Sequence, residues 1–208
     1  MFTVGLTGGI ASGKSVVLKE AARFADVETV QADRVAWELY EPGKEAYEEI
    51  LDIFGEEILE EGRERIDRGR LAEIVFSSPP LLDELEAVVH PRVMEELKSR
   101  RRKAEREGKK LFVIEAALIF QSQHVDLEFF DFIVTVRAPE EERIGRLKER
   151  DGLDREEALR RIKRQRCGER EDDGRSDFLI DSKGKKKDTE RAAREIFSEL
   201  LRRVEARN

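Results

Sequence analysis

The chain lacks most of the features that mark secreted, membrane-spanning and nucleic-acid-binding proteins. Cys167 is the only cysteine, which excludes a disulfide within the chain. No apolar run approaches the roughly 20 residues that a membrane-spanning helix needs, and no segment has the form of a signal peptide. An excess of basic residues is also missing, since the net charge is −7. We therefore expect a cytoplasmic protein that binds neither membranes nor nucleic acid.

Charge of both signs is abundant instead. Charged residues make up 42% of the 208 residues, slightly more than the 39% that are hydrophobic. The hydrophobic share still suffices for a core, and the length fits one large domain or a core with insertions. The charged share predicts a surface dense in ion pairs, a composition often met in heat-adapted proteins.

The most specific motif lies close to the N-terminus, where residues 8–15 read GGIASGKS and match the phosphate-binding pattern GxxxxGK[ST]. The apolar run Phe2–Leu6 before the motif predicts a buried strand, and Val16–Phe24 after it predicts a helix. Glycines let backbone N–H groups surround a phosphate, and the helix N-terminus adds partial positive charge. A glycine-rich turn without a ligand is the alternative, but this strand–loop–helix context favours a nucleoside triphosphate site.

The residue types in this motif have distinct chemical roles. The Lys14 ammonium can reach the β- and γ-phosphates of ATP, and the Ser15 hydroxyl can ligate Mg²⁺. We therefore predict that Lys14 is catalytic and that Ser15 is the protein ligand of the metal. The predicted nucleotide-binding residues are Gly9, Ala11, Ser12, Gly13, Lys14, Ser15 and Val16.

Further apolar runs alternate with helical patterns along the chain, which predicts an α/β fold. We expect the three-layer fold of P-loop NTPases, with a parallel five-stranded sheet and helices on both faces. The nucleotide-binding core would comprise residues 1–32, 108–138 and 176–208. The runs that predict the remaining strands are Val27–Val30, Leu111–Ile114, Phe132–Val136 and Phe178–Ile180.

The stretch 33–107 lacks strand signals and predicts a helical lobe that binds the second substrate. Its pattern is helical throughout, with breaks that include Ser77–Pro80 and His90-Pro91. Pro91 suits the first turn of a helix, so His90 is interpreted as a helix cap or as a contact with the acceptor.

A second helical insertion, 139–175, is rich in arginine. Arg146 and Arg150 are four residues apart and share a helix face. A mobile arginine-rich segment that closes over phosphates would be a lid for phosphoryl transfer. A static helical hairpin with Glu–Arg pairs, such as Glu142 with Arg146, is the alternative for any single arginine.

Two acidic residues follow predicted strands, at the edge of the sheet where such folds bind their ligands. Asp33 follows the second strand and is either a catalytic base or the N-cap of the next helix. Trp37 lies one turn later, where it can stack on an acceptor or pack on the core. Glu115 follows the third strand, a position suited to Mg²⁺ or its water shell.

The last part of the chain predicts structural elements rather than a site. The basic run Lys183–Lys187 is interpreted as a solvated loop, although a loop at this place can also touch a nucleotide. The final helix, about Thr189–Ala206, has one apolar face for packing. The residues of that face are Ala192, Ala193, Ile196, Phe197, Leu200, Leu201 and Val204.

Taken in order, these motifs resemble the dephospho-coenzyme A kinase family from Val4 to about Gly184. The aspartate after the second strand, the His-Pro pair and the lid arginines are more specific than the phosphate loop, which many enzymes share. The matching segments are Gly5–Ser15, Val30–Asp33, Glu41–Gly43, Phe54-Gly55, Arg68–Phe76, Val88–Val93, Arg146–Leu153, Gln165 and Leu179–Gly184.

The resemblance implies ATP-dependent phosphorylation of the ribose 3′-hydroxyl of dephospho-coenzyme A, the last step of coenzyme A synthesis. ATP, Mg²⁺ and dephospho-coenzyme A are then the expected ligands of a monomer or weak homo-oligomer. Asp33 would be the general base, and Arg146 would be the phosphate-facing lid arginine. Asp33, Trp37 and His90 would bind the acceptor.

Three positions depart from the family pattern. Gln31 replaces a first acid before Asp33, Gln121 replaces a glutamate after the third strand, and Ser182-Lys183 replaces an asparagine pair. These departures change side chains that the family pattern would place at acceptor and adenine contacts. Another small-molecule or nucleotide P-loop kinase is the nearest rival, whereas a nucleotide-dependent switch is disfavoured because no NKxD-like run is present.

Overall fold

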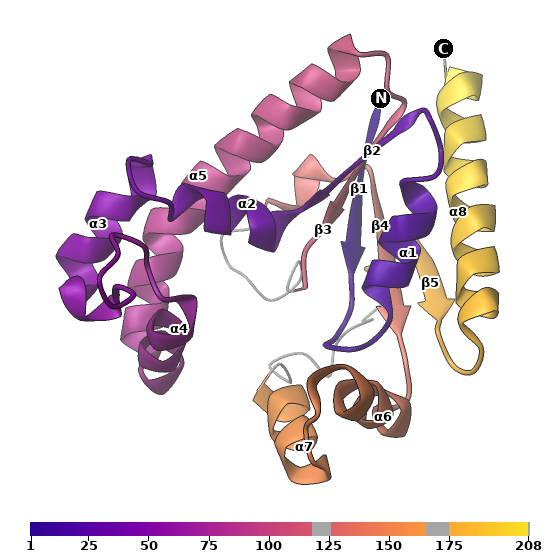
Figure 1. The fold of residues 1–208 in the computed structure, drawn as a ribbon. Helices are drawn as coiled ribbons and strands as arrows, with labels where there is room; N and C mark the ends of the chain where they lie inside the picture. Colours follow the sequence, from indigo (N-terminus) through magenta and orange to yellow (C-terminus); the bar gives the residue numbers. More distant parts are fainter. Residues whose placement is uncertain (118–125, 165–174, 208) are drawn as a thin grey trace. The chain divides into compact units, whose positions relative to one another are not determined.

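The computed structural model describes residues 1–117, 126–164 and 175–207 (Figure 1). The chain divides into two compact units, one of residues 1–30 with 103–208 and one of residues 31–102. The elements are β1 (Phe2–Thr7), α1 (Lys14–Ala21), β2 (Val27–Gln31), α2 (Ala32–Leu39), α3 (Glu45–Phe54), η1 (Glu56–Ile58), α4 (Arg68–Ser77), α5 (Pro79–Arg106), β3 (Leu111–Glu115), η2 (Leu127–Phe129), β4 (Phe132–Arg137), α6 (Glu140–Asp151), α7 (Arg155–Arg164), β5 (Phe178–Asp181) and α8 (Lys186–Arg207).

The five strands form one sheet in the order β2-β3-β1-β4-β5. The registers of β1 with β3, of β1 with β4 and of β4 with β5 are all parallel. All six residues of β1 are buried, as expected for a central strand covered on both faces. Each predicted strand is present, so the α/β class and the parallel sheet are confirmed.

Helices α1 and α8 lie side by side against the sheet and form its main hydrophobic core with β1, β3 and β4 (Figure 1). From α8, this core takes Ala193, Phe197, Leu200 and Val204, which confirms the predicted packing face. The helix begins at Lys186, earlier than the predicted Thr189.

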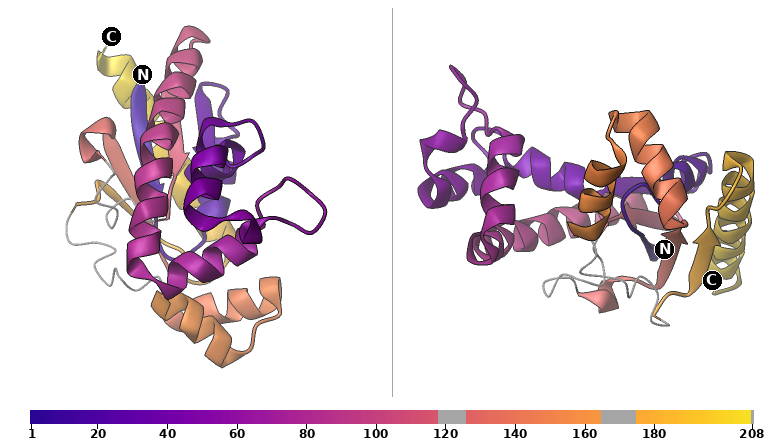
Figure 2. Two further views of the ribbon diagram at one scale, coloured as in Figure 1. Left: turned by 90° about the vertical axis from the view of Figure 1, so that its left-hand side faces the viewer. Right: turned by 90° about the horizontal axis from the view of Figure 1, so that it is seen from below.

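The predicted lid contains two short helices, α6 and α7, that pack against each other (Figures 1 and 2). Ile144, Leu147, Ala158 and Ile162 form a small core of their own. The rest of the predicted lid, residues 165–174, lies outside the described residues, as do Cys167 and Gln121.

The unit of residues 31–102 is mainly helical, but two predictions about it were wrong. The segment after η1 is not helical, because Leu59 and Ile66 form an antiparallel bridge. His90 and Pro91 do not open a helix, since both lie inside the 28-residue helix α5. The apolar residues Leu85, Val89, Val93 and Leu97 are spaced every four residues through this point and are all buried.

Packing along that stripe explains why one proline does not end α5. Pro91 removes one backbone donor from the helix. The Arg92 guanidinium donates to the Val88 carbonyl oxygen at 2.6 Å. A side chain therefore supplies a hydrogen-bond donor close to the position where the helix lacks the backbone N–H of Pro91. His90 is therefore not a helix cap.

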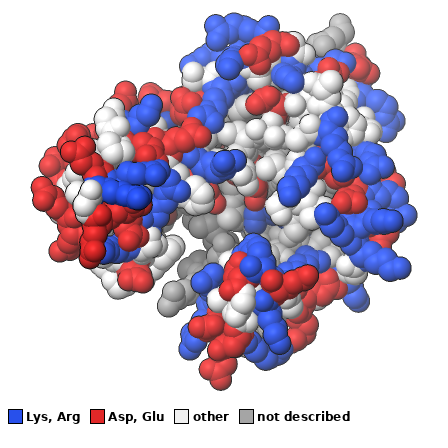
Figure 3. Space-filling model, viewed as in Figure 1, with Lys and Arg blue, Asp and Glu red and all other residues white. Residues whose placement is uncertain are grey.

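On the face shown in Figure 3, side chains of both charges are abundant. Many of them form ion pairs, as the composition predicted; for example, the Lys110 ammonium lies 3.0 Å from Asp26 and 2.7 Å from Glu205. Within the described ranges, no helix combines the length and apolar character needed to cross a membrane.

Candidate active site

The loop between β1 and α1 has the backbone geometry of a phosphate site. Gly8 has φ of 143°, and a Cβ there would lie 2.1 Å from the Val136 carbonyl oxygen, so this position excludes a side chain. Gly13, with φ of 106°, is the N-cap of α1. The positive end of the α1 dipole therefore lies at the loop, where it favours an anion.

Two polar side chains of the loop are suited to a phosphate ligand. The Lys14 ammonium donates to the carbonyl oxygens of Gly8 at 2.7 Å and Gly9 at 3.1 Å, which holds the cation over the loop. Among the described side chains, the Ser12 hydroxyl is the buried polar group without a hydrogen-bond partner. An unpaired buried hydroxyl is costly, and a phosphate oxygen would supply its partner.

A pocket of about 460 Å³ opens beside the loop, and all its walls belong to the unit that contains the sheet. One wall is the loop itself, through the predicted residues Ala11, Gly13, Ser15 and Val16. This volume lies in the range of small-molecule sites.

The other two walls come from distant parts of the chain. Helix α6 contributes Arg146, Glu149 and Arg150, and the connection from β5 into α8 contributes Ser182, Gly184, Lys186 and Thr189. The basic run Lys183–Lys187 is therefore partly a pocket wall and not only a solvated loop. The Arg150 hydrogen bond to Asp151 lowers the pKa of that carboxyl below its usual value.

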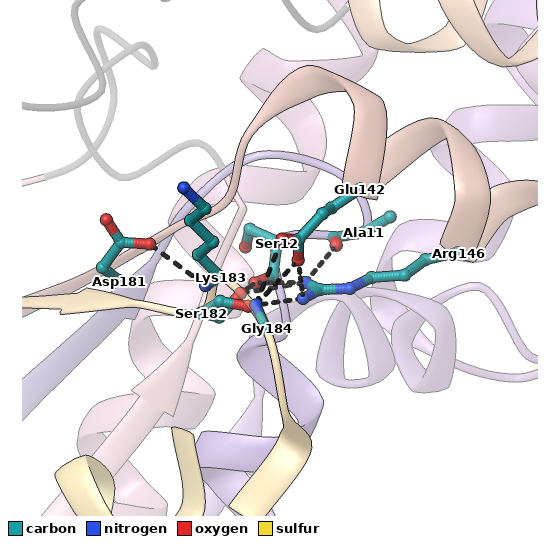
Figure 4. Close-up of polar contacts among 8 residues, drawn as sticks. All are labelled: Ala11, Ser12, Glu142, Arg146, Asp181, Ser182, Lys183 and Gly184. Carbon is teal, nitrogen blue, oxygen red and sulfur yellow. Dashed lines mark hydrogen bonds and ion pairs between the residues drawn. The ribbon is translucent and has the colours of Figure 1, made fainter. Parts of the chain in front are cut away.

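Arg146 joins all three walls through hydrogen bonds (Figure 4). Its guanidinium donates to the carbonyl oxygens of Ala11 and Ser12, both at 3.1 Å, and to that of Ser182 at 2.5 Å. It also donates to the Ser182 hydroxyl at 2.9 Å. Because these acceptors are mainly backbone oxygens, Arg146 fixes the relative positions of α6, the loop and the end of β5.

Glu142 and Ser182 complete this network. Glu142 forms the predicted ion pair with Arg146 at 3.0 Å and also accepts from the Gly184 amide at 3.1 Å. The Ser182 hydroxyl is buried and donates to the Ser12 carbonyl. Arg146 therefore has the Glu partner that the static-hairpin alternative predicted and also lines the pocket, whereas its contact with phosphate stays a prediction.

The residues around the loop match the way proteins hold Mg²⁺ with a nucleotide. Within the described residues, no cluster of three His, Cys, Asp or Glu side chains could hold a metal by itself. Mg²⁺ at nucleotide sites needs few protein ligands, because phosphates and water supply the others. The exposed Ser15 hydroxyl, in the first turn of α1, fits that role.

The predicted acceptor residues lie on α2 and α5. Asp33 is exposed and occupies the second position of α2, whereas Gln31 is the N-cap. The alternative that Asp33 is the N-cap was therefore wrong, although its carboxylate still lies in the favourable first turn. Trp37 is 42% exposed, which excludes packing in the core. His90 lies on α5, and its acceptor contact stays a prediction.

Two residues that the sequence argument missed lie close to Asp33 and Trp37. The Arg68 guanidinium lies over the Trp37 ring, 4.7 Å from its centroid. The pKa of Tyr40 is raised to about 12, mainly by burial and also by the Asp33 carboxylate, whereas Arg68 lowers it. Arg68 begins a segment that matches the family pattern, Arg68–Phe76, so the motif could be identified from the sequence. Its contact with Trp37 could not.

The parallel sheet, the phosphate loop and the pocket beside it define a nucleotide-binding protein of the P-loop class. The family model for dephospho-CoA kinase matches residues 2–188, and the chain belongs to this family. A dephospho-CoA kinase from Carboxydothermus hydrogenoformans is 38% identical over 183 residues, which are 87% of this chain and 85% of the relative.

Solved structures agree with this assignment. A crystal structure from Thermus thermophilus is 33% identical with a TM-score of 0.77, over 96% of this chain and 97% of the other. The dephospho-CoA kinase from Campylobacter jejuni is 25% identical with a TM-score of 0.68, over the same shares of the two chains.

Proposed function

We propose that the chain transfers the γ-phosphoryl group of ATP to the ribose 3′-hydroxyl of dephospho-coenzyme A, giving ADP and coenzyme A. The observation that carries the proposal is the pocket that α6 and the β5–α8 connection form around a phosphate loop, in a chain of this family. A kinase for another small molecule remains the rival, and the identity of the acceptor separates the two.

In the nucleotide half of the site, the loop and α1 would bind the phosphates of ATP. Lys14 would stabilise the negative charge that develops as the γ-phosphoryl group moves. Ser15 would hold Mg²⁺, which neutralises phosphate charge when it is bound. Arg146 would keep the walls of the pocket in the arrangement that places the triphosphate for transfer.

In the acceptor half, Asp33 would accept the proton of the 3′-hydroxyl. This proton leaves late, because the transition state of phosphoryl transfer is loose. Asp33 is therefore expected to orient the hydroxyl as well as to act as its base. Trp37 and His90 would contact the acceptor.

A panel of acceptors tests the proposal directly. With ATP and Mg²⁺, dephospho-coenzyme A should drive the release of ADP, and the product should carry a new phosphate on the ribose 3′-oxygen. Coupled detection of ADP and phosphorus NMR of the product measure these two results. Much faster turnover with AMP or shikimate would show that the acceptor is a different molecule.

The role of Arg146 gives a second prediction. Arg146→Gln removes the guanidinium charge that donates to several protein oxygens of the pocket walls. Because hydrogen bonds from a charged group are strong, we expect kcat/KM for ATP to fall by ~10- to 100-fold. We expect kcat to fall more than the KM for dephospho-coenzyme A rises, because a lid arginine acts mainly on the charge of the transition state. Steady-state kinetics with each substrate varied in turn measures both effects.

Arg155→Gln is the matched control for that experiment. Arg155 forms an ion pair with Glu141 at 2.5 Å on the exposed face of the same helix pair, away from the pocket. It should leave both kinetic constants within ~2-fold of the unmodified protein, as surface ion pairs usually do. Equal losses in the two variants would mean that Arg146 stabilises the helix pair only.

A further inference from the structure

A second pocket lies entirely within the unit of residues 31–102. It has a volume of about 300 Å³, and its lining combines the end of α2 with the segment that leads into α4. The side chains that matter for its chemistry are Tyr40, Glu41, Arg65 and Arg68. None of these residues was assigned a role by the sequence argument.

The two guanidinium groups of this pocket share one carboxylate as their ion-pair partner. The Glu41 carboxylate is shared by Arg65 at 2.5 Å and by Arg68 at 3.4 Å. Of the other two carboxylates of the lining, Glu60 pairs with Arg63 at 3.1 Å and also acts electrostatically on Arg65, and Asp67 caps α4. Among the described residues, Arg68 therefore shares its carboxylate partner with Arg65, and an anionic ligand can bind the rest of its guanidinium edge.

The geometry of Arg68 suits a phosphate ligand. Its guanidinium lies over the Trp37 ring, and a stacked guanidinium keeps its N–H groups pointing outward in its own plane. Such an edge can bind two phosphate oxygens at once. The nearby Tyr40 hydroxyl, which burial keeps protonated, can donate a further hydrogen bond.

Asp33 places this pocket next to the proposed reaction. The Asp33 carboxylate and the Arg68 guanidinium both act electrostatically on Tyr40, so the three groups share one neighbourhood. In dephospho-coenzyme A, the ribose that carries the 3′-hydroxyl also carries a diphosphate on its 5′-carbon. An acceptor whose 3′-hydroxyl meets Asp33 therefore brings its diphosphate to within the width of one sugar of the same residue.

We propose that Arg68, assisted by Arg65, binds the diphosphate of the acceptor and thereby selects adenosine diphosphate esters over adenosine. This inference rests on the proposed function, because it takes the acceptor and the role of Asp33 from there. The Trp37 ring would hold the Arg68 guanidinium in place by stacking, in addition to its predicted contact with the acceptor.

The test compares two acceptors in three forms of the full-length protein. Kinetics at saturating ATP are measured with dephospho-coenzyme A and with adenosine, for the unmodified protein, Arg68→Gln and Arg63→Gln. Arg63 is the matched control, because it lies in the same segment, is exposed and does not itself line the pocket, although its partner Glu60 does. Where adenosine turns over too slowly, its inhibition constant against dephospho-coenzyme A replaces its KM.

Arg68→Gln should lower kcat/KM for dephospho-coenzyme A by ~10- to 100-fold, mainly through a higher KM, because a charged hydrogen-bond donor is lost. In the same variant, the KM or inhibition constant of adenosine should change less than ~3-fold. Arg63→Gln should change neither kcat/KM for dephospho-coenzyme A nor the constant of adenosine. Equal losses for both acceptors, or no difference between the two variants, would overturn the inference. Failure of the unmodified protein to phosphorylate dephospho-coenzyme A would instead overturn the proposed function.

Discussion

Asp33→Asn should lower kcat by ~10²–10⁴-fold while leaving ATP binding nearly intact. Asparagine keeps the size of the side chain but cannot accept the proton of a secondary hydroxyl. Gln31, two residues earlier at the N-cap of α2, is not a base either, so this segment offers no substitute. Single-turnover measurement of coenzyme A formation, together with a titration of ATP binding, separates the loss of chemistry from a loss of binding.

A matched control removes another first-turn carboxylate from the same unit. Glu45→Gln changes an exposed acid in the first turn of α3, with the same loss of charge next to a helix N-terminus. Both variants should melt within a few degrees of the unmodified protein, because one exposed first-turn acid contributes little to stability. Full single-turnover chemistry in folded Asp33→Asn would show that another group, such as Glu115 or solvent, takes the proton.

Lys14→Ala should lower kcat by at least ~10²-fold. The ammonium is held over the loop by two carbonyl oxygens, and alanine removes this cation from the place where we propose that the phosphates bind. The KM for ATP should also rise, because the same cation acts on the ground state. Initial rates with varied ATP measure both constants.

Lys19→Ala is the control for this substitution. Lys19 is an exposed lysine in the last turn of the same helix, so its loss removes an equal charge at a distance from the loop. It should leave the kinetics unchanged and the fold intact. Near-normal turnover in a folded Lys14→Ala protein would mean that the phosphates bind without this lysine.

The parts of the molecule that could be predicted from the sequence are those encoded locally. Strands β1, β3 and β4 are short runs of mainly apolar residues, and the phosphate loop is contained in residues 8–15. The mistake at His90-Pro91 came from giving one proline more weight than the apolar stripe around it. Four buried residues at a spacing of four outweigh a single missing donor.

The hydrogen bonds that join the far walls of the pocket could not be predicted in this way. Arg146 and Ser182 bind mainly to backbone oxygens, which every residue possesses, so no sequence pattern marks those partners. Ser182 was identified only as a departure from an asparagine, yet its hydroxyl reaches a carbonyl of the loop. In unit 31–102, the Arg68–Trp37 contact likewise joins residues whose proximity depends on how α2 and α4 pack.

The order of the strands affects how the chain folds during its synthesis. Strand β1 is synthesised first, but its neighbours β3 and β4 begin only at Leu111 and Phe132. Sheets that depend on such distant pairing form slowly, because a long loop must close before any pairing is gained. Val136 faces Gly8, and Ser182 binds Ser12, so the loop reaches its final form late. A nascent chain that has not yet emerged to β5 carries the complete phosphate motif without a finished nucleotide pocket.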